Sequence, residues 1–189
     1  MNFTLYTDFT SAECHALNEH VARLGVEARV NWRGVQHDPG LPVPMRLLDR
    51  RALNELEDVI EDVRRLSPGL EIALPLGKPN TSAAIVAVAS VMRLHPVRAA
   101  AFRDGLYRAY WREGTDLSVM AELQRVADAA GVPRFVGLDH PDVEETVVEW
   151  ELDWATERLG GVPRVIRSDG RILWGLRSAD EISAFFLRG

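Results

Sequence analysis

Hydrophobic residues recur at two different spacings along the chain, and each change of spacing marks the end of an expected element. Phe3 and Leu5 stand among residues of high β propensity, which predicts a short strand that ends near Asp8. Over residues 12–24 the apolar positions recur with a helical period, and Gly25 is a typical helix stop. A second strand is predicted over residues 27–36.

The start of the first helix carries a capping signal. Thr10 and Glu13 have the spacing of a capping box, in which the hydroxyl binds the amide three residues on and the carboxylate reaches back. Ser11 then falls in the first turn, and Cys14 lies one turn into the helix.

The middle of the chain is predicted to be almost entirely helical. Apolar residues there keep a 3.6-residue period in segments that are separated by glycine, proline and polar residues. The expected helices cover residues 45–66, 81–95, 96–109, 117–127 and 143–159. Residues 70–76 are predicted to be extended, and Pro96 is well placed to open a helix.

The last part of the chain changes character again. Apolar residues lie on either side of Asp169-Gly170, a pair typical of a hairpin turn, over residues 162–174. Residues 178–187 then show a polar start and apolar positions at helical spacing, which predicts a closing helix packed on that hairpin.

Composition narrows the class of protein. The 189 residues carry a formal net charge of -6, which argues against a general affinity for nucleic acid. The first residues lack a signal-peptide pattern, and no apolar run approaches the roughly 20 residues that span a bilayer. A cytoplasmic protein without membrane contact is therefore expected. The single cysteine, Cys14, excludes a disulfide within the chain, and no cluster with metal-ligand spacing is present.

Several local motifs together resemble the DsbA-like branch of the thioredoxin superfamily. They are Tyr6-Thr7-Asp8-Phe9-Thr10-Ser11, Lys78-Pro79-Asn80-Thr81, Ala127-Asp128-Ala129-Ala130-Gly131, Gly161-Val162-Pro163 and Ile172-Leu173-Trp174-Gly175. Within that branch the sequence is most similar to 2-hydroxychromene-2-carboxylate isomerases and kappa-class glutathione transferases. The resemblance implies an α/β fold: a thioredoxin-like domain of residues 1–40 and 160–189, with residues 41–159 forming a helical insertion and connecting helices.

The resemblance also implies a site at the start of the first helix. The family places its attacking cysteine where this chain has Ser11 and a second cysteine where it has Cys14, so a dithiol cycle within one chain is impossible. Both are candidate catalytic residues. In the isomerases and kappa transferases the serine hydroxyl and the helix N-terminus hold the thiolate of bound glutathione, and a helix N-terminus does favour an anion. Glutathione is thus the implied cofactor.

Pro163 matches the cis-proline of the family, and the Val162–Pro163 bond is predicted to be cis. By the same resemblance, the backbone of Val162 pairs with an extended thiol peptide, while Lys78 and Asn80 line the same cleft. Ser11 and Pro163 are expected to lie across this cleft, with helices from residues 45–159 as its lid.

Two readings of function remain open. The first is an enzyme of the thiol- or glutathione-dependent isomerase or oxidoreductase type, without a CxxC dithiol. The second is a non-enzymatic member that binds a peptide or small ligand in the same cleft. Gly175 is followed by Leu176 and Arg177, where the family usually has a polar pair, and Glu13 brings a negative charge to the first turn. A small thiol or peptide is the expected partner in either case, and a homodimer is compatible with both.

Overall fold

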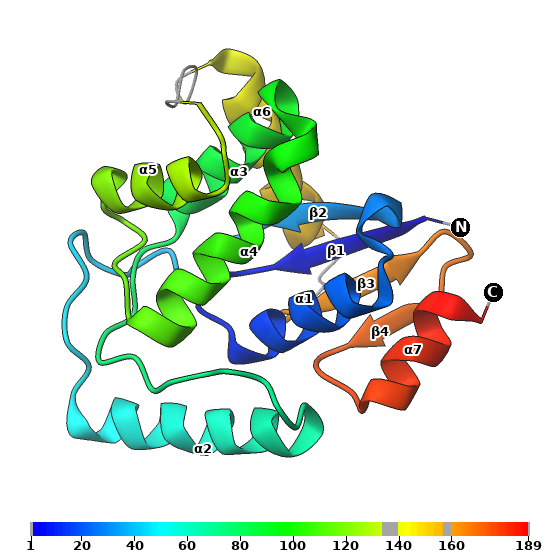
Figure 1. The fold of residues 1–189 in the computed structure, drawn as a ribbon, viewed down its shortest axis with the longest axis horizontal. Helices are drawn as coiled ribbons and strands as arrows, with labels where there is room; N and C mark the ends of the chain where they lie inside the picture. The colour runs from blue at the N-terminus through cyan, green and yellow to red at the C-terminus, as the bar shows by residue number, and fades with distance from the viewer. Residues whose placement is uncertain (1, 134–139, 157–159, 189) are drawn as a thin grey trace.

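The chain is built on a four-stranded mixed sheet that joins its two ends (Figure 1). The computed structural model describes residues 2–133, 140–156 and 160–188. The strands are β1 (Phe3–Thr7), β2 (Val30–Gly34), β3 (Arg164–Arg167) and β4 (Ile172–Trp174), in the order β2-β1-β3-β4. β1 is parallel to β2 and antiparallel to β3, which is antiparallel to β4. This arrangement is the expected α/β sheet.

Helices from both chain ends and from the middle cover this sheet. They are α1 (Ala12–Leu24), α2 (Arg50–Leu66), α3 (Ser82–Leu94), α4 (Pro96–Glu113), α5 (Met120–Ala129), α6 (Pro141–Thr156) and α7 (Ala179–Leu187). In Figure 1, α1 and α7 lie on the near face of the sheet, and α6 is placed behind β2, which it contacts. α3, α4 and α5 pack on one another beside the β2 edge. The strands lie at residues 3–34 and 164–174, outside the helical middle.

Aromatic side chains fill the space between the sheet, α1 and α4. Phe9 lies 4.8 Å from Tyr107 and 5.8 Å from Trp32, measured between ring centroids. The indole N–H of Trp111 donates to the Phe9 carbonyl over 2.9 Å, and the hydroxyls of Thr7 and Tyr107 share a hydrogen bond. Together these contacts fix the segment that leads from β1 into α1.

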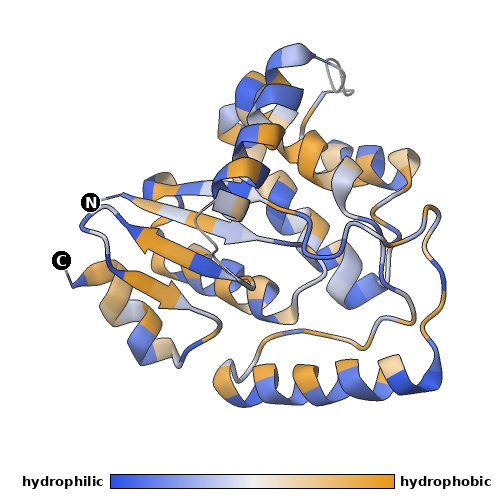
Figure 2. Cartoon of the chain, turned by 180° about the vertical axis from the view of Figure 1, so that it is seen from behind, coloured by the Kyte–Doolittle hydropathy of each residue, from blue (hydrophilic) through white to orange (hydrophobic). Residues whose placement is uncertain are grey.

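The predicted helix from Met45 begins only at Arg50, after the N-cap Asp49. The preceding residues pair instead with the extended segment after α2, through a bridge between Leu47 and Gly77. α2 is strongly amphipathic, with apolar and polar residues alternating along it in Figure 2. It buries Ile60 and Val63 and leaves Val59 exposed.

The second strand is also shorter than predicted. Residues 27–29 form a turn of 3-10 helix, so β2 begins at Val30. By contrast, Pro96 opens α4 and Gly25 ends α1 in the left-handed conformation, as predicted.

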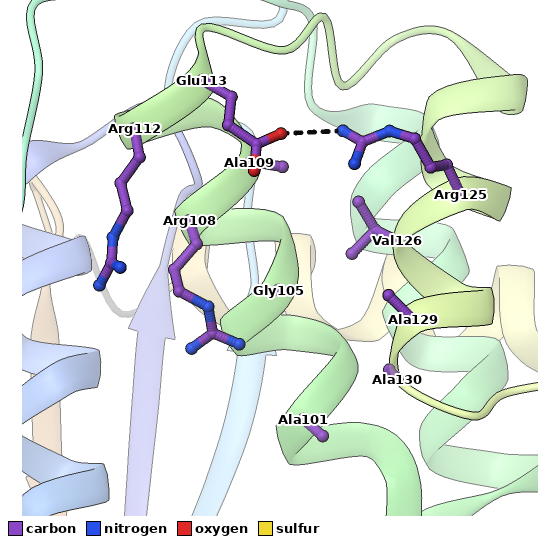
Figure 3. A pocket seen from close by; sticks show the side chains of 10 residues that line it. All are labelled: Ala101, Gly105, Arg108, Ala109, Arg112, Glu113, Arg125, Val126, Ala129 and Ala130. Carbon is purple, nitrogen blue, oxygen red and sulfur yellow. Dashed lines mark hydrogen bonds and ion pairs between the residues drawn. The ribbon is translucent and has the colours of Figure 1, made fainter.

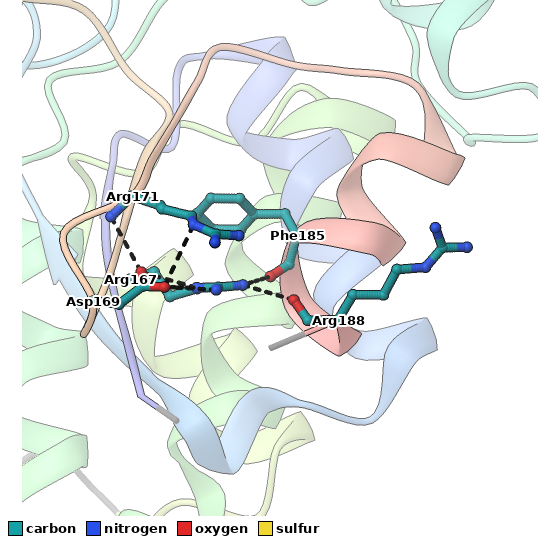
Figure 4. A network of polar contacts seen from close by, with 5 residues as sticks. All are labelled: Arg167, Asp169, Arg171, Phe185 and Arg188. Carbon is teal, nitrogen blue, oxygen red and sulfur yellow. Dashed lines mark hydrogen bonds and ion pairs between the residues drawn. The ribbon is translucent and has the colours of Figure 1, made fainter.

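The C-terminal hairpin and helix are tied together by Arg167 (Figure 4). Its guanidinium binds the Asp169 carboxylate in the hairpin turn and donates to the carbonyls of Phe185 and Arg188 in and after α7, over 3.3 and 2.8 Å. Gly170 has a φ of 86°, which suits the predicted Asp-Gly turn. Arg167 is 3% exposed, whereas its partner Asp169 lies in the exposed turn.

Candidate functional site

Ser11, and not Thr10, caps the first helix. The Ser11 hydroxyl accepts from the backbone N–H of Cys14 over 3.2 Å, and its backbone is extended. Thr10 stands one residue before the cap, and its N–H and hydroxyl both donate to the Asp8 carboxylate, over 3.0 and 3.2 Å. The predicted capping box of Thr10 and Glu13 is therefore wrong. Ser11 is half-buried and stands at the positive end of α1, with one lone pair used by the cap.

Cys14 points into the protein. It is 1% exposed, and burial raises the pKa of its thiol to about 12, against the hydrogen bonds from Ser11 and Thr7 that lower it. Since the thiolate is the reactive form of cysteine, this environment suppresses nucleophilic chemistry at Cys14. The hydroxyl of Ser11 is the group left at the helix start.

Pro163 lies beside the end of β1 from which the chain continues to Ser11. Arg164 pairs with Tyr6, so Pro163 and Val162 come next to the last residues of β1. The Val162–Pro163 bond is cis. The Pro163 carbonyl accepts from the backbone N–H of Gly175 over 3.0 Å, which brings the loop after β4 to the same place.

Glu13 connects the first turn of α1 to that loop. Its carboxylate accepts a hydrogen bond from the backbone N–H of Leu176 and lies near the charge of Arg177. A Cβ on Gly175 would come within 3.5 Å of the Glu13 Oε2. Burial raises the pKa of Glu13, although the Leu176 hydrogen bond and the Arg177 charge oppose the shift. Glu13, at the start of α1, thus uses the Leu176 N–H as its hydrogen-bond donor.

Lys78 and Asn80 contact the loop that leaves β2. The Lys78 ammonium lies 3.9 Å from the Asp38 carboxylate. The Asn80 side-chain oxygen accepts from the side-chain amide of Gln36 over 2.8 Å, and its nitrogen donates to the Leu41 carbonyl over 3.0 Å. Asn80 is therefore committed to holding this loop, while Lys78 keeps a looser contact. Neither Lys78 nor Asn80 forms a hydrogen bond or ion pair with Ser11.

Asp8 is a residue that sequence reasoning missed. It is 1% exposed, and besides Thr10 it accepts from the backbone N–H of His37 over 2.7 Å. It therefore ties the segment before α1 to the loop after β2. The sequence showed its position between a predicted strand and a predicted helix, but not its distant partner His37.

Within the described ranges, no three His, Cys, Asp or Glu side chains converge to hold a metal ion.

Comparison with known proteins agrees with this architecture. The model of the DSBA-like thioredoxin domain family matches residues 3–186. No curated protein sequence matches the chain. None of the helices in the described ranges is both long and apolar enough to cross a membrane.

Solved structures with the same fold cover nearly the whole chain. One described as a probable DsbA oxidoreductase from Streptomyces coelicolor has a TM-score of 0.77 at 16% identity, covering 100% of this chain and 89% of its own. A 2-hydroxychromene-2-carboxylate isomerase has a TM-score of 0.68 at 19% identity, covering 100% and 93%. The cytosolic disulfide reductase DsbM of Pseudomonas aeruginosa, determined with GSH, has a TM-score of 0.71 at 13% identity, covering 98% and 96%.

Proposed function

Because the chain belongs to the DSBA-like thioredoxin domain family, we propose that it holds the thiolate of glutathione, or of a small thiol substrate, at Ser11. The observation that carries the proposal is the place of the Ser11 hydroxyl, which caps the free N-terminus of α1. The cap uses only an oxygen lone pair, so the hydroxyl hydrogen would exchange its bond to the Cys14 sulfur for one to the ligand thiolate. The unpaired amides of the first turn add to the attraction for an anion.

The neighbouring elements supply the rest of a thiol-peptide site. Val162 stands next to the end of β1, where its backbone would pair with an extended peptide and add a short strand. Lys78 adds a positive charge on the loop side, and Asn80 keeps that loop in place. DsbM has been determined with GSH, which supports glutathione as the thiol for this fold.

The proposed enzyme works without thiol chemistry of its own. A thiolate held at Ser11 would add to an electrophilic carbon of a second substrate and leave again after the rearrangement, so that glutathione is regenerated. This reaction class suits an isomerase, and 2-hydroxychromene-2-carboxylate isomerase shares the fold. Cys14, with its pKa raised to about 12, serves in this proposal as part of the packed helix and not as a nucleophile.

A second candidate function is binding without catalysis. Glu13 favours this function. Its carboxylate, in the first turn of α1, accepts a hydrogen bond from the Leu176 N–H. A fixed negative charge at this point disfavours a thiolate and leaves room for a neutral peptide or small ligand. In both versions we propose a cytoplasmic location, in keeping with the single cysteine and with the cytosolic DsbM.

Calorimetric titration with glutathione and with S-methylglutathione tests the proposal. Glutathione should bind more tightly than its methylated form, because only the free thiol can become an anion at Ser11. A Ser11→Ala variant should lose this difference. Ser178→Ala is the matched control, since Ser178 caps α7 through the same hydrogen bond to the third helical residue. Equal affinities for the two ligands would favour the binding-only function, and no affinity for either would refute the proposed site.

A further inference from the structure

A groove lies between α4 and α5, away from the sheet (Figure 3). Its volume is about 290 Å³, and small residues line much of it: Ala101, Gly105, Ala109, Ala129 and Ala130. The two helices approach closely at Gly105, where an added Cβ would come within 2.8 Å of Val126 Cγ1. The small side chains leave a space that is otherwise bordered by long, charged residues.

The charges that border the groove are mainly positive. Arg108 and Arg112 come from α4 and Arg125 comes from α5, while Glu113 is the acid among the lining residues. Arg108 and Arg112 are four residues apart in one helix, so they lie on the same face of α4. The groove is therefore locally positive, although the whole chain carries a net charge of -6.

Arg108 is the arginine of this groove that lacks an acidic partner. It is half-buried, and it forms no hydrogen bond or ion pair with any residue in the described part of the chain. Figure 3 shows Arg108 and Arg112 extending from the same side of α4, while Arg125 reaches from α5 toward Glu113. Charged groups that lose part of their water are usually paired, so an unpaired guanidinium indicates a place for an anion.

The other two arginines are paired with exposed acids. Arg112 forms an ion pair with Glu71, whose side chain is 71% exposed. Arg125 pairs with Glu113 and Glu122, whose side chains are 56% and 40% exposed. Exposed pairs of this kind contribute little, because water solvates both ions and salt screens their attraction. A ligand with a higher negative charge can therefore compete with these carboxylates.

We propose that the groove between α4 and α5 binds a small soluble molecule that carries a phosphate monoester group. Arg108 and Arg112 hold the phosphate oxygens, because the planar guanidinium group matches phosphate with two parallel hydrogen bonds. A doubly charged group suits the excess of arginine better than a single carboxylate does. The small residues leave room for an uncharged body of about one ring. Neither Ser11 nor Pro163 lines the groove, so this site is separate from the proposed thiol site.

Phenyl phosphate and phenyl sulfate are the probes for this site. They carry the same ring, but at pH 8 the phosphate has two negative charges and the sulfate has one. In calorimetric titrations at low salt, phenyl phosphate should bind about 3- to 10-fold more tightly than phenyl sulfate, as expected for one additional charge near a protein surface. High salt should weaken the binding of both. Glutathione should not displace phenyl phosphate, and displacement would place the phosphate at the thiol site and overturn the proposal.

Charge variants of the groove separate a specific site from general attraction. Arg108→Gln should weaken phenyl phosphate binding about 10-fold or more, the loss expected for a charge-assisted hydrogen bond. Arg51→Gln in α2, which removes an exposed guanidinium far from the groove, should leave binding unchanged. Glu113→Gln removes the negative charge of the lining and should strengthen binding about 3-fold. A gain in affinity cannot arise from damage to the fold.

Two exposed alanines of α5 provide a matched pair of variants. Ala129→Glu places a negative charge in the groove and should abolish binding of phenyl phosphate. Ala121→Glu makes the same change on the same helix at a position that does not line the groove, and it should have little effect. Equal affinity for the two probes, or equal binding by Arg108→Gln and Arg51→Gln, would overturn the proposal.

Discussion

The hydroxyl of Ser11 accepts a hydrogen bond from the backbone N–H of Cys14, 3.2 Å away. This bond makes Ser11 the N-cap of α1. The two positions at which the family has its cysteines, Ser11 and Cys14, therefore lie in different surroundings. Ser11 stays half-buried at the helix start, while Cys14 turns into the core. The hydroxyl is thus available to a ligand and the thiol is not, which determines the chemistry open to this site.

Replacing Glu13 by glutamine should strengthen glutathione binding about 3- to 10-fold at pH 8. The carboxylate charge repels a thiolate at Ser11, and an interaction of roughly 1 kcal/mol is expected at such a partly buried site. Burial raises the pKa of Glu13, so its carboxylate becomes charged at a higher pH than that of an ordinary glutamate. Calorimetry measures the change, with Glu181→Gln in the first turn of α7 as control. Unchanged or weaker binding would show that Glu13 does not face the thiolate.

The reaction of Cys14 with a disulfide reagent such as DTNB should be slower in the folded protein than in urea, by a factor of roughly 100 or more. The pKa of about 12 leaves little thiolate at neutral pH, and the side chain is 1% exposed. Stopped-flow absorbance measures both rates. Comparable rates before and after unfolding would contradict the buried position.

The protein should not reduce insulin disulfides at the rate of a two-cysteine relative. A mixed disulfide on Cys14 would have no second cysteine to resolve it, because the chain has only one. The turbidity assay with dithiothreitol checks this, and a Cys14→Ser variant should match the original protein. Turnover that disappears in Cys14→Ser would instead reveal exchange with an external thiol.

Stability should fall as the pH is lowered from 7 to 5, in part because of His15. Burial lowers the pKa of His15 to about 4, aided by the charges of Arg112 and Arg108. Between that value and about 6.5 the unfolded chain binds a proton that the folded protein does not, so lowering the pH from 7 to 5 favours unfolding by roughly 2 kcal/mol.

A His15→Phe variant keeps the stacking on Tyr107 and Trp111 but cannot titrate. Urea denaturation at the two pH values should show a smaller loss of stability in this variant. His140→Phe removes an exposed histidine and is the control. Equal losses in all three proteins would exclude His15 as the cause.

Asp8→Asn should lower the free energy of unfolding by about 2 to 3 kcal/mol. The buried carboxylate accepts hydrogen bonds from Thr10 and from the His37 N–H, and an amide would set its own donor against one of these donors. Asp38→Asn is the matched control in the neighbouring loop, because its contact with Lys78 is long and partly exposed. Chemical denaturation compares the two, and similar small effects would mean that Asp8 does not hold the segment.

The sequence by itself determined the kinds of element and most of their ends. Gly25, Pro96 and Asp169-Gly170 act through their own backbone preferences, so a helix stop, a helix start and a hairpin turn could be predicted without knowing the fold. The single cysteine likewise excluded a dithiol site from the sequence alone. The order of elements along the chain, together with the local motifs, then implied the DsbA-like α/β fold.

Only the tertiary structure decided what happens where distant segments meet. Thr10 and Ser11 are both good capping residues, and Asp8, held by His37 from another loop, draws Thr10 away and leaves the cap to Ser11. Asn80 was expected to face a ligand, yet its side chain binds the loop after β2. Glu13 reaches Leu176 from the other end of the chain. Such choices depend on hydrogen-bond partners far away in sequence, whereas local spacing specifies only which residues are able to take each role.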